Sequence, residues 1–133
     1  MYLFNPRDTN GVTTNRPRPG EQVMSVTDQY LYRGGIGHSV PKIRGLAMSF
    51  GGRIEGVPVR DALGGSNGFR RPGYAISIDP GLLYVHGLYT FSVNGPWAVQ
   101  RNRKRSVSDY QNGIHGDAAF ADYAVLASIS RRF

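Results

Sequence analysis

Cysteine is absent from this chain of 133 residues, and lysine occurs only at Lys42 and Lys104, beside fourteen arginines. Without cysteine the chain forms neither a disulfide framework nor a cysteine-ligated metal site. For the same reason, the sequence does not indicate whether the protein resides in a reducing or an oxidising compartment. Charged residues reach only 19% of the composition. No apolar run approaches the roughly 18 residues that a membrane-spanning helix requires. These absences argue against a disulfide-stapled domain and against a helical membrane protein.

Helical periodicity is missing as well. The chain contains 18 glycines and 8 prolines, and no long segment repeats apolar residues with the period of about 3.6 of an amphipathic helix. Residues 1–8 lack the basic and then apolar regions of a signal peptide. If the protein is exported, we therefore expect its targeting segment to lie upstream of Met1.

Apolar residues recur instead with a period of two. In the clearest segment, Tyr89, Phe91 and Val93 alternate with small or polar residues, which is the pattern of a strand with one apolar face. The same alternation predicts five strands, near residues 23–38, 45–57, 74–85, 88–100 and 119–133. Each is roughly as long as the ~9–11 residues that cross a bilayer as a tilted strand, and longer than the ~5–6 of an ordinary soluble sheet.

The connections alternate between short and long. Residues 39–44 and 86–87 form short links, whereas 58–73 and 101–118 are long and rich in Gly, Asn, Ser and Arg. Outer-membrane barrels show this asymmetry, with short periplasmic turns and long extracellular loops. Counting back from a periplasmic C-terminus makes 58–73 and 101–118 outer loops, and residues 5–21 become a third outer loop.

The sequence therefore predicts an all-β fold, an antiparallel up-and-down meander of about five long strands that is part of a transmembrane β-barrel. Residues 1–133 are expected to form a single barrel segment. Five strands do not close a barrel, because bacterial single-chain barrels have at least ~8. We therefore expect further strands, either from upstream of Met1 or from other chains.

Charged residues on the less apolar face of the expected strands are candidates for the barrel lumen, because a charge on the lipid face costs about 2–4 kcal/mol at the midplane. These candidates are Arg33, Arg53, Glu55, Asp79, Asp122 and Arg132. Two interpretations stay open for them. They either select the solutes that pass or form a purely structural ladder of paired charges.

A basic cluster begins the third long connection, with Arg101, Arg103, Lys104 and Arg105 close together. Read alone, such a cluster suggests nucleic acid, but no recognition-helix pattern surrounds it. At the start of an outer loop, the cluster is a candidate for binding the phosphates of lipopolysaccharide. The alternative is a solvated loop, and nucleic acid is the least favoured partner.

Catalytic and metal chemistry are only weakly indicated. Ser66 lies in a Gly-Gly-Ser-Asn-Gly segment that satisfies the G-x-S-x-G pattern, but a nucleophile elbow needs a strand before the serine and a helix after it. The residues after Ser66 predict a strand. His38, His86 and His115 are isolated from one another in the sequence, without the close spacing of a metal site. We expect no catalytic residue, no metal and no cofactor.

The C-terminus carries a family resemblance. Tyr123, Val125, Ile129 and the terminal Phe133 resemble the C-terminal signal of bacterial outer-membrane proteins, which the barrel-assembly machinery reads. Residues 45–61, 68–80 and 101–133 also resemble uncharacterised outer-membrane proteins, some of them described as transporters. The resemblance implies the outer membrane of a Gram-negative bacterium as location, and lipid, lipopolysaccharide and the assembly machinery as partners.

Three classes of function remain after these observations. The leading expectation is an outer-membrane barrel segment, structural or pore-forming for small solutes, and not an enzyme. The alternative is a small soluble all-β module that binds an anionic ligand or nucleic acid, in which the same alternation buries one face of a sandwich. An outer-membrane hydrolase that uses Ser66 is third.

Overall fold

The computed structural model describes residues 1–115 and 120–133, and ten strands and one short helix lie in them. The fold is all-β and mostly antiparallel, as the sequence predicts. Residues 116–119, which fall in the expected loop 101–118 and at the start of the expected strand 119–133, lie outside the described residues. The elements are β1 (Tyr2–Leu3), β2 (Thr9–Thr13), β3 (Val23–Ser25), β4 (Gln29–Ser39), β5 (Leu46–Val57), β6 (Gly73–Ile78), β7 (Gly81–His86), β8 (Tyr89–Asn94), β9 (Trp97–Arg103), α1 (Val107–Gln111) and β10 (Leu126–Arg131).

The strands form one large sheet and one small sheet. The large sheet has eight strands in the order β1-β4-β5-β7-β8-β10, and β6 pairs with both β5 and β9. The small sheet pairs β2 with β3. Among the described residues, the path of the large sheet ends at β1 and β10, which do not pair with each other. The sheet is therefore open and is not a closed barrel.

Two of the five expected strands are interrupted where proline occurs. The strand expected at 74–85 is divided into β6 and β7 by Asp79-Pro80, and the strand expected at 88–100 is divided into β8 and β9 by Gly95-Pro96. Proline has no N–H to donate to a strand ladder. The two interruptions lie side by side, because the Gly95 N–H donates to the Pro80 carbonyl at 2.9 Å. Neighbouring strands therefore break at the same level.

The other three expected strands agree with the observed strands to different degrees. The strand expected at 45–57 is observed as β5, Leu46–Val57. The segment 23–38 contains β3 and β4, separated where Asp28 turns its backbone N–H to the Asp61 carboxylate. The strand expected at 119–133 is regular only over Leu126–Arg131. The five expected strands thus correspond to β4, β5, β6 with β7, β8 with β9, and β10.

The chain divides into two compact units, a division that the apolar alternation does not predict. Unit 1 comprises Met1–Tyr32, Ile54–Ala75 and Arg101–Phe120, and unit 2 comprises Arg33–Arg53, Ile76–Gln100 and Ala121–Phe133. Strands β4, β5, β6 and β9 contribute residues to both units. The described residues of all three expected outer loops belong to unit 1, and both short links belong to unit 2.

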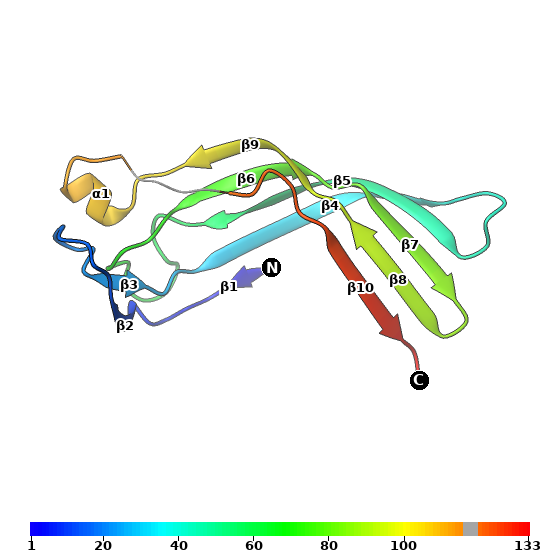
Figure 1. The fold of residues 1–133 in the computed structure, drawn as a ribbon, viewed down its shortest axis with the longest axis horizontal. Coiled ribbons are helices and arrows are strands. Elements are labelled where there is room, and N and C mark those ends of the chain that lie inside the picture. The colour runs from blue at the N-terminus through cyan, green and yellow to red at the C-terminus, as the bar shows by residue number, and fades with distance from the viewer. Residues whose placement is uncertain (116–119) are drawn as a thin grey trace. The chain divides into compact units, whose positions relative to one another are not determined.

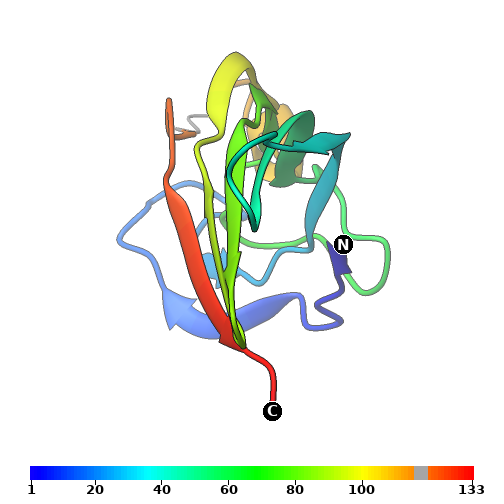
Figure 2. The same ribbon diagram turned by 90° about the vertical axis from the view of Figure 1, so that its right-hand side faces the viewer.

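The most regular part of unit 2 is the hairpin of β7 and β8. Six residue pairs run in antiparallel register from Gly81 opposite Asn94 to His86 opposite Tyr89. Gly87 opens the turn with φ 57°, and glycine is favoured at that position of a two-residue hairpin turn because a side chain there is strained. The turn is Gly87-Leu88, one residue later than expected. Strand β10 pairs with β8 over six further residues and lies beside it in both views (Figures 1 and 2).

The described residues contain almost no hydrophobic core. Ala75, at 2% exposure, is the single hydrophobic residue in the core of this part of the chain, whereas 26 large hydrophobic residues are exposed. Charged and polar residues occupy the interior instead, among them Glu21, Asp28, Arg70 and Asp79. This distribution is the reverse of that in an ordinary soluble domain.

None of the described helices has the length and apolar character that a membrane span needs.

Candidate functional site

Strand pairing in unit 2 gathers apolar side chains on one side of the sheet, which we call the apolar face. Directly paired residues point to the same side of an antiparallel sheet. Met48 is opposite Leu82, and Leu82 is opposite Val93 on the next strand. The face comprises Leu46, Met48, Leu82, Tyr84, Tyr89, Phe91, Val93, Ala127 and Ile129, and His86 and Arg131 lie on the same side opposite Tyr89, near the hairpin turn. Apart from the half-buried Leu46, its large residues are exposed, with Ile129 at 71% exposure.

The other side of the same strands, the polar face, carries mainly small and polar residues near the proline break. Ser92 lies opposite Ser128, and their hydroxyl oxygens are 2.8 Å apart. Asn94 lies opposite Gly81, and its side chain occupies the space that a Cβ at Gly81 would need. Toward the hairpin turn, this face also carries Leu83 and Val85. The two faces of unit 2 therefore differ chemically, as the alternation predicts.

An ion pair joins two of the six lumen candidates on this polar side. The Arg33 Nε lies 2.6 Å from an Asp79 carboxylate oxygen, and the Asp79 side chain is fully buried while that of Arg33 is 44% exposed. Strand β5 lies between β4 and β6, so the pair spans β5. At Gly51 the backbones of β4 and β5 approach closely, because a Cβ there would collide with the Gly34 and Gly35 backbone.

Arg33, Gly35, Gly51 and Asp79 also line a cavity of about 310 Å³. The Asp79 backbone N–H donates to the Gly51 carbonyl at 2.8 Å, which fixes the carboxylate-bearing residue to the strand beneath the pair. The Asp79 carboxylate is buried and compensated by Arg33, whose half-exposed guanidinium is the charged group of the pair that solvent reaches. The arrangement has the chemistry to bind or orient a small polar or charged solute.

The remaining lumen candidates are distributed differently. Arg53 and Glu55 are half-buried on β5, whereas Asp122 and Arg132 are exposed. The Arg132 backbone N–H donates to the Leu88 carbonyl at 2.9 Å, just beyond the end of β10. The expected row of six lumen charges thus contains one buried carboxylate, Asp79.

The basic cluster lies at the end of β9 and in the segment before α1. Arg101, Arg103 and Lys104 are exposed, and Arg105 is half-buried. The Lys104 backbone N–H donates to the Pro72 carbonyl at 3.1 Å, and its ammonium lies 6.0 Å from the ring centroid of Tyr74. The Arg105 guanidinium lies 5.9 Å from the Tyr110 ring. The cluster is therefore attached to the second long loop.

The residues of the predicted assembly signal are all strongly exposed. Tyr123, Val125, Ile129 and Phe133 are each more than two-thirds exposed. Tyr123 forms an isolated antiparallel bridge with Trp97. Phe133 follows β10, and its ring lies 5.4 Å from the Arg131 guanidinium. These side chains are accessible to a partner, although their role as a signal stays a prediction.

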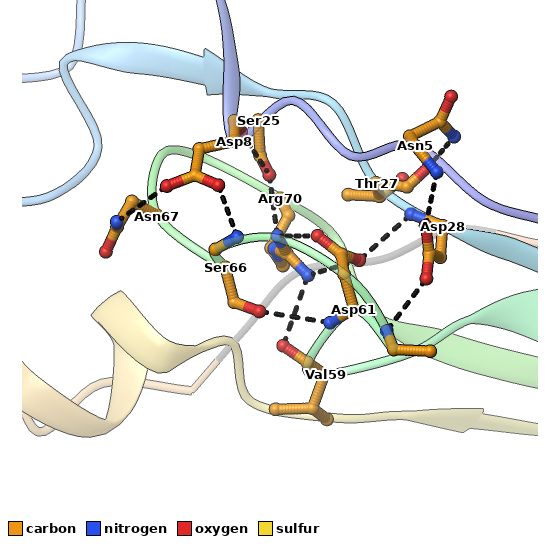
Figure 3. A network of polar contacts seen from close by, with 12 residues as sticks. Asn5, Asp8, Ser25, Thr27, Asp28, Val59, Asp61, Ser66, Asn67 and Arg70 are labelled. Carbon is orange, nitrogen blue, oxygen red and sulfur yellow. Dashed lines mark hydrogen bonds and ion pairs between the residues drawn. The ribbon is translucent and has the colours of Figure 1, made fainter.

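A buried network in unit 1 was not predicted from the sequence (Figure 3). Two Arg70 nitrogens donate to the two carboxylate oxygens of Asp61 at 3.0 and 2.7 Å, and both side chains are fully buried. Arg70 also donates to the Ser25 hydroxyl at 2.8 Å and to the Val59 carbonyl at 3.3 Å. Paired, two-point contacts of this kind are the strongest that arginine makes with a carboxylate.

Asp28 extends this network to the N-terminal segment. Its carboxylate accepts hydrogen bonds from the backbone N–H groups of Asn5 at 2.6 Å and Ala62 at 2.8 Å, and from the Tyr2 hydroxyl at 3.0 Å. Burial acts to raise the pKa of Asp28, but these hydrogen bonds and the charge of Arg70 outweigh it and hold the pKa below its ordinary value. The carboxylate stays charged inside the protein.

Asp8 holds the same long loop at a second place. Its carboxylate accepts hydrogen bonds from the Gly65 N–H and from the Asn67 side chain. Together, Asp8, Asp28 and Arg70 fasten the loop 58–72 to the N-terminal segment. No local sequence pattern predicts these contacts, because the partners are 9 to 59 positions apart in the sequence. A usable signal was the occurrence of carboxylates in loops of a chain that has only 9 acidic residues.

Ser66 takes part in this network as a structural residue. Its hydroxyl accepts a hydrogen bond from the Asp61 N–H at 3.0 Å. Strand β6, and not a helix, follows it, so the context of a nucleophile elbow is missing. Within residues 1–115 and 120–133, no group of three or more histidine, cysteine or acidic side chains has the geometry to hold a metal ion.

Comparisons of the chain with protein-family models, with curated proteins and with solved structures found no match. The family resemblance of the C-terminus therefore stays a prediction. A functional conclusion rests on the distribution of apolar and charged residues and on the geometry of the two units.

Proposed function

We propose that this chain forms part of a transmembrane β-barrel in a bacterial outer membrane and contributes to the wall of a pore for small solutes. The barrel is completed by further strands, because the sheet of the described residues is open at β1 and β10. Its partners are outer-membrane lipid, lipopolysaccharide and the barrel-assembly machinery.

The inverted distribution of apolar and charged residues carries this proposal. Large apolar side chains line one face of unit 2 and are exposed, whereas Asp79 is buried on the other side. In water, an uncovered apolar face of this extent is unfavourable and marks an interaction surface. Hydrocarbon is the surrounding that suits an outward apolar face and an inward polar one, since barrel strands alternate in this way.

The distribution of connections supports the same proposal. The three long loops belong to unit 1, whereas the short links belong to unit 2. A strand that crosses a bilayer must connect to its neighbours alternately at one side and at the other, and outer-membrane barrels keep the long loops on the outside. A soluble sandwich imposes no such alternation of long and short connections.

The Arg33–Asp79 pair supports the proposal that the chain lines a pore. Both residues lie on the side opposite the apolar face, and the cavity beside them is lined by glycine backbone. Glycine in a barrel strand permits the close approach and curvature that a narrow lumen needs. Fixed charges beside such a lumen set which solutes pass.

The single tryptophan provides a direct test. Trp97 is 63% exposed and is paired with Tyr123. Tyr123 precedes Ala127 and Ile129 of the apolar face by an even number of residues. After refolding of the chain into phosphatidylcholine vesicles, we expect a blue-shifted Trp97 emission that brominated acyl chains quench strongly. The matched control is Trp97→Phe combined with Ser92→Trp, which places the reporter on the polar face.

The expected result is strong quenching at position 97 and weak quenching at position 92. Equal quenching at both positions would show that the faces are assigned wrongly. A stable monomer that needs no detergent or lipid would overturn the proposal and favour the soluble all-β module.

A further inference from the structure

The surface charge of unit 1 is unbalanced. Its described residues include ten basic and six acidic side chains. Seven of the ten basic residues are exposed, whereas each of the six acidic residues is buried or half-buried. The exposed charged residues of unit 1 are thus all basic among its described residues.

Two buried carboxylates of unit 1 accept hydrogen bonds from the backbone. Asp28 accepts from the N–H groups of Asn5 and Ala62, and Asp109 accepts from the Ser106 N–H at 2.8 Å as part of the cap of α1. A carboxylate that is used in this way is unavailable to an exposed arginine. Asp28 and Asp109 therefore do not neutralise the exposed arginines of unit 1.

Three loops bring basic residues into neighbouring positions. Arg16 from the first loop and Arg71 from the second both lie over the ring of Phe69, at 3.9 and 5.5 Å from its centroid. The residue after Arg71 is Pro72, whose carbonyl accepts from the Lys104 N–H of the third loop. The Arg16 guanidinium also forms an ion pair with the Glu21 carboxylate, which is 3.7 Å away and 2% exposed.

Phe69 gives this group of charges a fixed geometry. A guanidinium that is stacked on an aromatic ring loses less freedom when it binds a ligand, because its position is set in advance. Two like charges over one ring repel each other, and the Glu21 carboxylate beside Arg16 offsets part of that repulsion, which a bound anion would offset further. The geometry is suited to a doubly charged phosphate group.

The order of residues on β9 indicates that this anion is carried by a lipid surface. The exposed residues Trp97, Val99, Arg101 and Arg103 follow one another at every second position. A strand that leaves hydrocarbon shows this order, with an aromatic residue and then basic residues at the phosphate level. Nucleic acid and soluble anions give no reason for it.

We propose that unit 1 binds the phosphate groups of an anionic glycolipid, namely lipopolysaccharide, through Arg16, Arg71, Arg103 and Lys104. This inference rests on the proposed function and adds to it a site built by three loops. The proposed site keeps Arg103 and Lys104 of the basic cluster that the sequence predicts and adds Arg16 and Arg71. Arg101 and Arg105 of that cluster are not assigned to the site.

The test compares two double variants that remove the same charge. Arg71→Gln with Lys104→Gln removes two exposed charges of the site, and Lys42→Gln with Arg44→Gln removes one lysine and one arginine that are exposed elsewhere, in unit 2. Each basic residue near an anionic surface contributes about fivefold to binding. We expect affinity for phosphatidylcholine vesicles that contain lipopolysaccharide to fall about 30-fold in the first variant and less than threefold in the second.

Three further probes identify the source of the phosphate. Tight binding to lipopolysaccharide vesicles, with weak binding to phosphatidylglycerol vesicles of equal charge, supports the proposal. Equal binding to both vesicles overturns it, since any anionic surface would then suffice. Displacement by millimolar inorganic phosphate, or equal loss of binding to duplex DNA in the first variant, also overturns it in favour of a soluble anion or nucleic acid.

Quenching of Trp97 in neutral vesicles keeps the two proposals separate. If Trp97 is quenched but both double variants bind lipopolysaccharide alike, the phosphate site is wrong and the barrel proposal stands. If the first variant alone loses lipopolysaccharide binding while Trp97 is not quenched, the site stands and the barrel proposal is wrong.

Discussion

Unit 1 and unit 2 are stabilised in different ways. Unit 1 holds its long loops with buried ionic and polar groups, above all the Arg70–Asp61 pair and Asp28. Unit 2 consists of strands in regular register with small polar residues on one side and exposed apolar residues on the other. Neither unit has a conventional apolar core among the described residues.

This difference indicates that the two units obtain their stability from different sources. A buried ion pair is weak evidence for a net gain on folding, but loss of one partner is costly because the other charge is left buried. Unit 1 should therefore respond strongly to changes inside its loop network. Unit 2 should respond to its surroundings, because its largest apolar side chains face outward.

The largest expected effect tests the interior of unit 1. Replacing Arg70 by Met leaves the Asp61 carboxylate buried without its two-point partner, and this class of change costs about 3–5 kcal/mol. We expect urea denaturation in detergent to show that loss of stability. The exposed residue Arg60 is the control, since Arg60→Met should change stability by less than about 0.5 kcal/mol. Similar effects at both positions would remove the contrast between the two units.

The next prediction tests the two faces of unit 2. Phe91 lies on the apolar face and Ser92 on the polar face of β8. An arginine on a lipid-facing position costs about 2–4 kcal/mol at the bilayer midplane, whereas a lumen position tolerates it. We expect Phe91→Arg to reduce folding into lipid vesicles much more than Ser92→Arg, measured by protection from protease. Equal tolerance of both substitutions would contradict the assignment of faces.

Acid should weaken unit 1 through Asp28. The pKa of this carboxylate is lowered in the folded protein, so its contribution is fully present above the ordinary value of 3.8 and is lost as the pH falls through the lowered pKa. We expect stability to decrease as the pH is lowered below about 4. Asp28→Asn should be less stable at neutral pH and should lose part of this acid dependence. An unchanged pH profile in that variant would show that Asp28 is not the responsible group.

The smallest effect on stability is expected at the C-terminus of unit 2. Phe133 is fully exposed, so its deletion should change the stability of the purified protein by less than about 0.5 kcal/mol. If the assembly machinery reads this residue, the deletion should nevertheless lower the amount of heat-sensitive folded protein in the outer membrane of a Gram-negative host. Arg132→Ala is the control at the neighbouring position. Reduced folded protein in the control alone would contradict the signal.

The sequence by itself determined the fold class, the approximate strands and the two faces of unit 2. These features follow from alternation at every second residue, which is local, because a strand places residues i and i+2 on the same side. Tyr89, Phe91 and Val93 could therefore be assigned to one face without coordinates, and Asp79 to the opposite one. The breaks at Pro80 and Pro96 could also have been predicted from the sequence, since proline interrupts a strand ladder.

Only the tertiary structure decided which distant groups meet. Arg70 with Asp61 is a contact within one loop, and Asp28 with Asn5 and Arg16 with Phe69 are contacts between connecting segments, whose conformation has no period that a sequence reveals. The same is true of the pairing of Arg33 with Asp79 across β5. Alternation predicts the side on which a charge lies, whereas its partner depends on how the chain returns through space.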